Sequence, residues 1–247
     1  MDNLILQFSL VIIITFFASF IQRVSGFGFG IFAMTFLPYI MSAYTEANVL
    51  SSMLSMLLSL AVSIRMFRNI HWKNIIFPLI GSMVFTFISV SFMKGQADTL
   101  MRLLLGIALI LLSLYFLIFS GKIHIRPTWY GGLVAGSLSG ILGGLFSMGG
   151  PPVVIYYMES EKQPVHYMAT IQAYFTISNI YSIGVKVSAG FVTSNVLACF
   201  AIGLVGVVAG LVVGSRVFDK MDGPKIKKAV YIIMALSGVA NIVTTLV

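Results

Sequence analysis

The sequence predicts an all-α integral membrane protein with about eight to ten membrane segments, arranged as two inverted five-segment repeats. The 247 residues are 59% hydrophobic and only 9% charged, whereas soluble globular proteins carry about a quarter charged residues. The apolar runs reach the length of about 20 residues that a helix needs to cross a bilayer. Two glycine-rich breaks, about 120 residues apart, interrupt these runs. The breaks predict broken helices or re-entrant hairpins inside the membrane.

Ten apolar segments follow one another along the chain. They cover approximately residues 4–22, 27–44, 47–64, 75–93, 100–119, 130–147, 152–158, 165–185, 191–215 and 228–247. Most of them are long enough to cross the bilayer as helices. The seventh is too short to cross alone, at about 1.5 Å of rise per residue. Whether the second and seventh segments cross the bilayer completely stays open.

The chain divides into two similar halves, a first repeat at 1–126 and a second at 127–247. Short stretches of the halves match in order, at offsets that grow from 117 to 125 residues. The matched pairs are Ala18–Gly28 with Ala135–Leu145, Glu46–Ser51 with Val165–Thr170, and Gly81 with Gly206. We interpret this as a duplication, although chance matches between glycine- and alanine-rich segments are the alternative.

Basic residues set the expected topology. The odd-numbered connections between segments hold twelve Lys and Arg residues and the even-numbered ones hold three, with Arg23 assigned to the first connection and Lys186 to the eighth. Positively charged connections stay in the cytoplasm, so both termini should face outward. Because five segments per repeat is an odd number, the second repeat should be inverted. The net charge of +8 is thus explained by topology, and we expect no nucleic-acid partner.

The two breaks are the strongest functional signal in the chain. The first break spans Ser25–Gly30 and the second spans Gly143–Pro152. Backbone that leaves the helix inside a bilayer must be covered by protein or by a watery cavity. Two such breaks in corresponding halves indicate a transporter binding site near the membrane midplane.

The helices that start after the breaks would direct free N–H groups and positive dipole ends into the cavity, which favours an anion. Prolines suit the first turn of such a helix. The residues that we expect to bind substrate are Arg23, Ser25, Gly26, Gly28, Gly30, Gly143, Gly144, Ser147, Met148, Gly149, Gly150 and Pro151. For Arg23, extension to the cytoplasmic surface is an equal alternative. For the other glycines of the chain, such as Gly131, Gly132, Gly136, Gly203 and Gly210, we expect helix packing.

Polar residues recur in the segments that follow the breaks. Ser51, Ser52, Ser55 and Ser59 lie at intervals typical of one helical face, and Thr170, Gln172 and Asn179 occupy the corresponding segment of the second repeat. They could line a polar path or bond to neighbouring helices. Glu46 and His166 open these two segments and are candidates for proton coupling, with helix capping as the alternative. We expect Glu159 and Glu161 to be solvated in a short loop.

No pattern of an enzyme or a metal site is present in the sequence. His71, His124 and His166 are dispersed without ligand spacing, and no phosphate loop or catalytic triad occurs. The single cysteine, Cys199, excludes an internal disulfide. We therefore expect no metal, no cofactor and no enzymatic activity. The expected partners are a small anionic substrate and the lipid bilayer. Whether the protein also forms a homodimer stays open.

The second break, Gly-Gly-Leu-Phe-Ser-Met-Gly-Gly-Pro-Pro at 143–152, together with the glycine-rich first break, resembles the TauE/SafE sulfite exporter family across essentially the whole chain. Carried over by position, Gly26, Gly28 and Gly30 stand for the first family motif. The second corresponds to Ser147, Gly149, Gly150, Pro151 and Pro152. Phe27 and Phe29 interrupt the glycines of the first motif, which departs from the family pattern.

The resemblance implies a multi-pass secondary transporter of the cell inner membrane. It would move a small sulfur-containing oxyanion, sulfite or an organosulfonate, usually outward and by alternating access. An anion channel with the breaks as a constriction, or a carrier of a small carboxylate, is the alternative. A membrane scaffold for partner proteins ranks last, because the chain has almost no soluble loops or tails.

Overall fold

The structure, a computed structural model, describes residues 2–119, 125–217 and 223–246, although the side chains of 2, 3, 24, 25, 119, 217, 223–230 and 246 are not described. The described chain is all-helical and has no strand. Its α-helices are α1 (Asp2–Ser25), α2 (Phe29–Ile40), α3 (Tyr44–Arg65), α4 (Trp72–Met93), α5 (Asp98–Leu114), α6 (Trp129–Phe146), α7 (Gly150–Ser160), α8 (Pro164–Ser188), α9 (Ser194–Val217) and α10 (Gly223–Leu246). A 3₁₀ turn follows α3 at Phe67–Asn69, and a π-helical turn extends α5 at Tyr115–Phe119.

Among the described residues, six helices are long and apolar enough to cross a membrane. These spans are Leu4–Arg23, Tyr44–Arg65, Trp72–Met93, Asp98–Ile118, Trp129–Phe146 and Ser194–Arg216. Most of the large hydrophobic side chains that remain exposed, such as Phe87, Leu111, Val205 and Leu236, lie on these helices and on α10. A surface of this kind is compatible with lipid and incompatible with water, so the chain is a multi-pass membrane protein.

The second segment is shorter than the sequence predicted. The expected run was 27–44, but α2 covers only the 12 residues Phe29–Ile40, about 18 Å at the helical rise. Gly28 precedes it with φ 107°, and Met41 follows it in extended conformation. A helix of this length reaches only part of the way through a hydrocarbon core about 30 Å thick. The short α7, with 11 residues, matches the expectation for the seventh segment.

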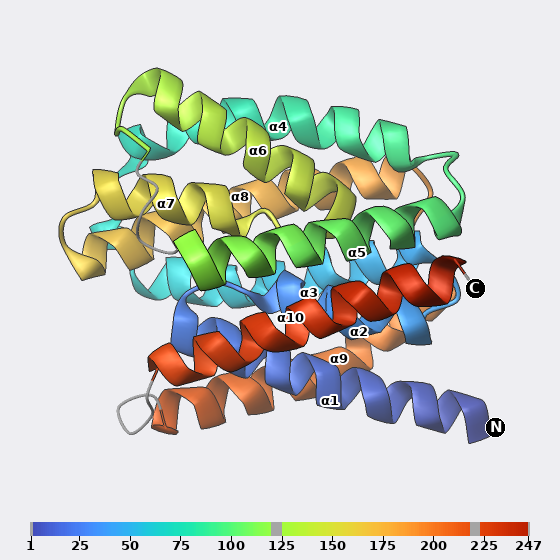
Figure 1. Ribbon diagram of the computed structural model, residues 1–247. Coiled ribbons are helices and arrows are strands. Elements are labelled where there is room, and N and C mark those ends of the chain that lie inside the picture. The colour runs from blue at the N-terminus through green and yellow to red at the C-terminus, as the bar shows by residue number, and fades with distance from the viewer. Residues whose placement is uncertain (1, 120–124, 218–222, 247) are drawn as a thin grey trace.

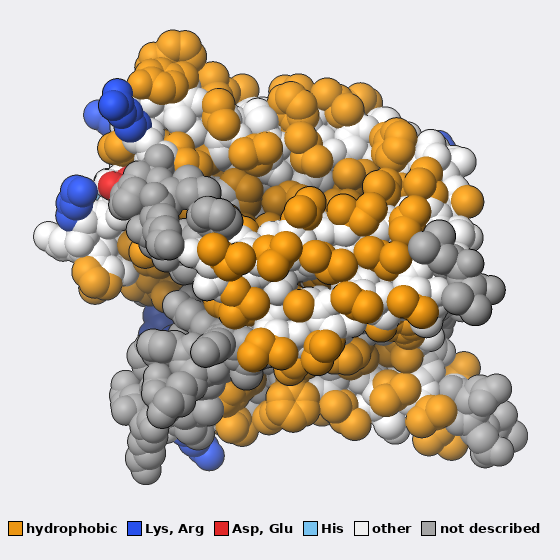
Figure 2. All heavy atoms as spheres, viewed as in Figure 1, with side chains coloured by type: hydrophobic (Ala, Val, Ile, Leu, Met, Phe, Trp, Pro, Cys, Tyr) orange, Lys and Arg blue, Asp and Glu red, His pale blue; other side chains and the backbone are white. Residues whose placement is uncertain are grey.

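The helices pack in pairs that join distant parts of the chain. α6 lies along α4, α9 along α1, α10 along α5, and α8 along α3; Figure 1 shows α4 with α6, and α5 with α10, as neighbours on the outside of the bundle. Both termini lie at one end of the molecule (Figure 1). On the face drawn in Figure 2, most Lys and Arg side chains gather at the other end, which we call the basic end, and hydrophobic side chains cover the region between.

Glycines allow two of these helix pairs to approach closely. A Cβ atom at Gly136 would lie 2.0 Å from the Pro78 carbonyl oxygen, and one at Gly210 would lie 2.2 Å from the Phe16 carbonyl oxygen. Gly132 and Gly203 also face neighbouring helices, which confirms the expected packing role for these four glycines. Gly131 differs, because its Cβ would meet the Arg126 carbonyl oxygen just before α6.

Candidate functional site

The helical backbone is interrupted at both places that the sequence predicted, between α1 and α2 and between α6 and α7. α1 ends at Ser25 and α2 begins at Phe29, with Gly26 and Gly28 between them at φ 82° and 107°. α6 ends at Phe146 and α7 begins at Gly150. The residue after α6, Ser147, has φ 56° and is the one non-glycine residue in the described chain with positive φ. The left-handed conformation is unfavourable for serine. Strain of this kind clusters at functional sites, so Ser147 is a candidate functional residue.

The two breaks lie directly against each other. A Cβ atom at Gly30 would fall only 1.8 Å from the carbonyl oxygen of Ser147. A Cβ atom at Gly150 would lie 3.5 Å from Cβ of Phe27. No side chain fits between the backbones at Gly30, so glycine is required there for close approach. Residues separated by more than a hundred positions thus form one site.

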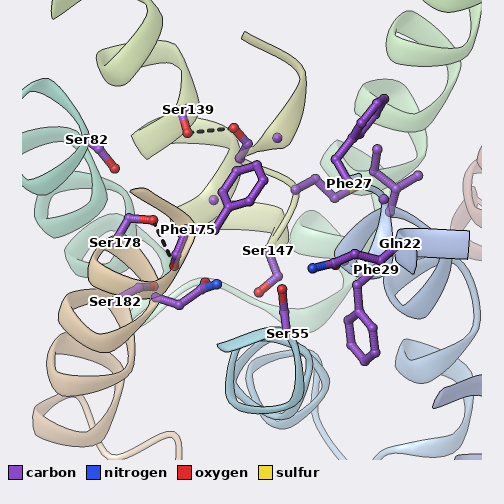
Figure 3. A pocket seen from close by; sticks show the side chains of 18 of the residues that line it. Gln22, Phe27, Phe29, Ser55, Ser82, Ser139, Ser147, Phe175, Ser178 and Ser182 are labelled. Atoms are coloured by element: carbon purple, nitrogen blue, oxygen red, sulfur yellow. Dashed lines mark hydrogen bonds between the residues drawn. The ribbon is translucent and has the colours of Figure 1, made fainter. Parts of the chain in front are cut away.

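A small cavity of about 50 Å³ lies where the breaks meet. This is more than the volume of about 10–15 Å³ that one water needs on the same measure, and it suits a ligand of a few heavy atoms. Ser147, Ser55 and Gln22 extend toward the same space from the second break, α3 and α1 (Figure 3). The lining, here called the central cavity, consists of Gln22, Phe27, Gly28, Phe29, Gly30, Ile31, Ser55, Ser82, Thr86, Ser139, Gly143, Ser147, Met148, Gly149, Gly150, Phe175, Ser178, Asn179 and Ser182.

The central cavity is polar but uncharged. Its polar lining comes from seven hydroxyl groups and the amides of Gln22 and Asn179, and none of its described lining residues is ionisable. The starts of α2 and α7 also border it. The first N–H groups of a helix have no partner within the helix, and the positive dipole end is located there. Hydroxyls and free amides without carboxylates favour an anionic ligand over a cation.

Side chains of α3 and α8 hold the broken backbones. Asn48 Nδ2 donates to the carbonyl oxygen of Leu145 at 2.8 Å, and the Tyr44 hydroxyl donates to the same oxygen at 2.8 Å. Gln172 Nε2 donates to the carbonyl oxygen of Gly26 at 2.9 Å. These are carbonyls that α6 and α1 leave without helical partners. Each break is therefore fixed by a helix of the other half of the chain.

Ser139 fixes the start of α7. Its hydroxyl donates to the carbonyl oxygen of Gly149 at 2.6 Å and accepts from the Tyr174 hydroxyl at 2.8 Å. Tyr174 is fully buried, so this chain of two bonds joins α8 through α6 to the second break. It limits the positions that the N–H groups of α7 can take.

The structure brings together part of the expected substrate-binding set. Gly28, Gly30, Gly143, Ser147, Met148, Gly149 and Gly150 line the central cavity, as do Ser55 and Asn179 of the expected polar path. Gly26, Gly144 and Pro151 are adjacent but do not line it. The side chain of Ser25 lies outside the described residues. Substrate binding by this set stays a prediction.

The remaining residues of the polar path have other partners. Ser52 bonds Ser147 and lies behind the cavity wall. Ser51 is buried with no hydrogen-bond partner among the described residues, and the Thr170 hydroxyl accepts the His71 backbone N–H at 3.0 Å. With Gln172 bonded to Gly26, most of this stripe supports helix packing, and only Ser55 and Asn179 reach the cavity.

Arg23 lines a second, larger cavity. Its Nε donates to Ser215 Oγ at 2.8 Å, and together with Arg65 it borders a space of about 390 Å³ between α1, α3, α8 and α9. We call this the lateral cavity. Gln22 lines both cavities, so the two adjoin. Arg23 is placed to attract an anion toward the central cavity, without lining it.

Glu46 and His166 lie at opposite ends of the antiparallel helices α3 and α8, away from the central cavity. Glu46 is buried and accepts from Thr193 Oγ1 at 2.7 Å and Asn195 Nδ2 at 3.2 Å. His166 Nδ1 lies 2.8 Å from the Asn69 carbonyl oxygen. Neither residue lines the cavity, and proton coupling through them stays a prediction.

The expectation that Glu161 is solvated is wrong. Its side chain is buried, lies 2.7 Å from His71 Nδ1, and accepts from Asn74 Nδ2 at 2.8 Å. The rings of His71 and His166 stack with centroids 4.2 Å apart. The loop after α7 folds back onto the start of α4, and sequence spacing gave no indication of this long-range contact. Glu159 is half-buried.

The assignment of Lys186 to a connection is also wrong. It lies in the last turn of α8 and is fully buried. The sequence also missed Gln22, Ser82, Thr86, Ser139 and Ser182 as cavity residues. A signal was available for some of them, because Ser82 with Thr86, and Ser178 with Ser182, are spaced four residues apart on one face of an apolar helix.

The broken helices, the uncharged donor-lined cavity and the apolar exterior define a membrane transporter. The chain belongs to the sulfite exporter TauE/SafE family, whose profile matches residues 11–241. This is a transporter family and not an enzyme family.

The chain is also similar to the probable sulfite/organosulfonate exporter TauE of Cupriavidus necator, with 22% identity over 165 residues. The match covers 65% of this chain and 64% of that protein. No solved structure matches the chain.

Proposed function

We propose that this protein is a secondary active transporter that exports a small sulfur-containing oxyanion, sulfite or an organosulfonate, by alternating access. The observation that carries the proposal is the contact of Gly30 with Ser147 beside the central cavity. Two helix starts with unpaired N–H groups meet there, and serine hydroxyls line the space beside them. The family and the name of the relative from Cupriavidus necator support the sulfur-containing substrate class.

The pattern of helix contacts supports an inverted repeat, with 1–126 and 127–247 as its two units. If each helix is exchanged with the one five positions along, the contact of α4 with α6 becomes that of α9 with α1, and the contact of α4 with α8 becomes that of α9 with α3. Likewise, α2 with α3 becomes α7 with α8. Such internal symmetry is typical of carriers that move one repeat against the other around a fixed site.

Two carboxylate clusters support alternating access. Glu46 of the first repeat bonds Thr193 and Asn195 of the second at one end. Glu161 of the second repeat contacts His71 and Asn74 of the first at the other end. Each cluster ties the two repeats together at a different end, so opening of either end requires the loss of only one cluster.

The proposal is tested with purified protein by thermal shift against sulfite, thiosulfate, methanesulfonate, sulfoacetate and small carboxylates. A ligand that binds the native state raises its apparent stability, so we expect stabilisation by sulfur oxyanions. Stabilisation by carboxylates alone would reassign the substrate. In proteoliposomes, unlabelled substrate on the opposite side of the membrane should accelerate sulfite flux, an effect known as counterflow. Flux without saturation or counterflow would instead indicate a channel.

A further inference from the structure

Lys186 is a buried amino group beside the second break, with no role assigned so far. Its side chain has no exposed surface. Its Nζ donates to Ser52 Oγ at 2.6 Å and lies 3.5 Å from Ser147 Oγ. Ser147 lines the central cavity. Lys186 is therefore separated from the substrate space by one serine side chain.

The charge of Lys186 has no protein counter-ion in the described chain. No carboxylate of the described residues lies within 4.0 Å of its Nζ. Glu46, the acidic residue of α3, is bonded to Thr193 and Asn195 instead. In a buried site an isolated ammonium is unfavourable relative to the neutral amine, and an approaching opposite charge favours the ammonium form. The central cavity lies on the other side of Ser147, and its uncharged polar lining favours an anion.

The hydroxyl network connects the ammonium group to the cavity. Lys186 donates to Ser52, whose oxygen lies 2.5 Å from Ser147 Oγ, and Ser147 Oγ donates to the Asn48 carbonyl oxygen at 2.9 Å. Ser147 keeps this position in a left-handed conformation, φ 56°, that glycine would adopt more easily. A serine there supplies a hydroxyl that bonds Asn48 and Ser52, which glycine could not do, and it places one side chain between Lys186 and the cavity.

We propose that Lys186 is the counter-ion of the transported anion, acting across Ser147, and that it sets the preference of the site for ligand charge. This inference rests on the proposed function. Backbone N–H groups and hydroxyls bind any small oxyanion, whereas the attraction to a fixed positive charge grows with the charge of the ligand. Lys186 therefore favours divalent oxyanions, such as thiosulfate and fully ionised sulfite, over monovalent sulfonates.

The test compares two ligands of different charge on variants of the full chain. Dissociation constants are measured by calorimetry for thiosulfate and methanesulfonate with wild type, Lys186→Met, which removes the charge, and Lys186→Arg, which retains it. Lys94→Met is the matched control, because Lys94 is exposed at the end of α4. We expect Lys186→Met to weaken thiosulfate binding by about tenfold or more and methanesulfonate binding by clearly less. Lys186→Arg should retain the wild-type ratio of the two constants, and Lys94→Met should leave both unchanged.

The outcomes separate the inference from the proposed function. If folded Lys186→Met weakens both ligands by the same factor, or neither, Lys186 has only a structural role and the inference is overturned. If the wild type binds neither anion, the proposed function fails first. Lys186→Gln keeps a hydrogen-bond donor and provides the same comparison if Lys186→Met does not fold.

Discussion

Gly30 of α2 and Ser147 of the second break meet with backbone against backbone, so that a Cβ atom at Gly30 would lie 1.8 Å from the Ser147 carbonyl oxygen. This contact joins the two halves of the chain at the central cavity. It makes the geometry of the site dependent on the absence of a single methyl group.

Gly30→Ala should therefore impair both folding and transport. The new methyl group must displace backbone atoms, and overpacking of this kind costs about 1–3 kcal/mol or more. We expect a lower unfolding temperature and loss of sulfite flux in proteoliposomes. Gly184→Ala is the matched control, because nothing lies within 4 Å of its Cβ position in α8. It should be neutral or more stable by about 0.5–1 kcal/mol. Equal behaviour of the two variants would argue against the contact.

Two substitutions of Ser147 separate its conformation from its hydroxyl group. Ser147→Gly removes the hydroxyl but relieves the left-handed strain of about 1 kcal/mol, which offsets only part of the loss of hydrogen bonds worth about 1 kcal/mol each. Ser147→Ala removes the hydroxyl and keeps the strain. We expect a smaller fall in unfolding temperature for Ser147→Gly than for Ser147→Ala, and weaker sulfite binding in both. Wild-type affinity in Ser147→Gly would exclude the hydroxyl from ligand binding.

The carboxylate clusters predict opposite changes in access to the cavity. Ser178 lines the central cavity, and Ser178→Cys in a Cys199→Ala background provides a single thiol for a membrane-impermeant reagent. Glu161→Gln weakens the contacts with His71 and Asn74, so labelling should accelerate from the end of the molecule where His71 lies. Glu46→Gln should accelerate it from the opposite end.

Labelling of Ser178→Cys without either glutamate substitution gives the baseline, measured in right-side-out and inside-out vesicles. Acceleration from the same end by both glutamate variants would contradict the assignment of the clusters to opposite ends.

Arg23 should affect the encounter with substrate more than the bound state. It borders the lateral cavity beside Arg65, and a cation at the entrance raises the local concentration of anions in a salt-dependent manner. We expect Arg23→Gln to raise the KM for sulfite by about two- to fivefold, with kcat nearly unchanged. The difference should shrink as ionic strength rises. Lys94→Gln removes the same charge from an exposed position just after α4, away from both cavities, and should have no effect. A large fall in kcat would place Arg23 in the bound site instead.

The sequence alone determined the class of this protein and the positions of its two helix breaks. Hydropathy identifies lipid-facing helices because the bilayer accepts few charges, and glycine clusters within them identify the breaks because lipid cannot satisfy open backbone. Both breaks, at Gly26–Gly28 and Ser147–Gly149, lie in the structure where they were expected.

Only the tertiary structure decided which side chains meet at that site. Helical periodicity places Ser52 and Ser55 on one polar face. It does not show which of the two lines the cavity. Lys186 is near the end of an apolar run, and its position in the chain is equally compatible with a loop. Its burial against Ser52 depends on how α8 packs along α3. Such contacts form between residues more than a hundred positions apart. They depend on how the helices pack, which local sequence patterns do not determine.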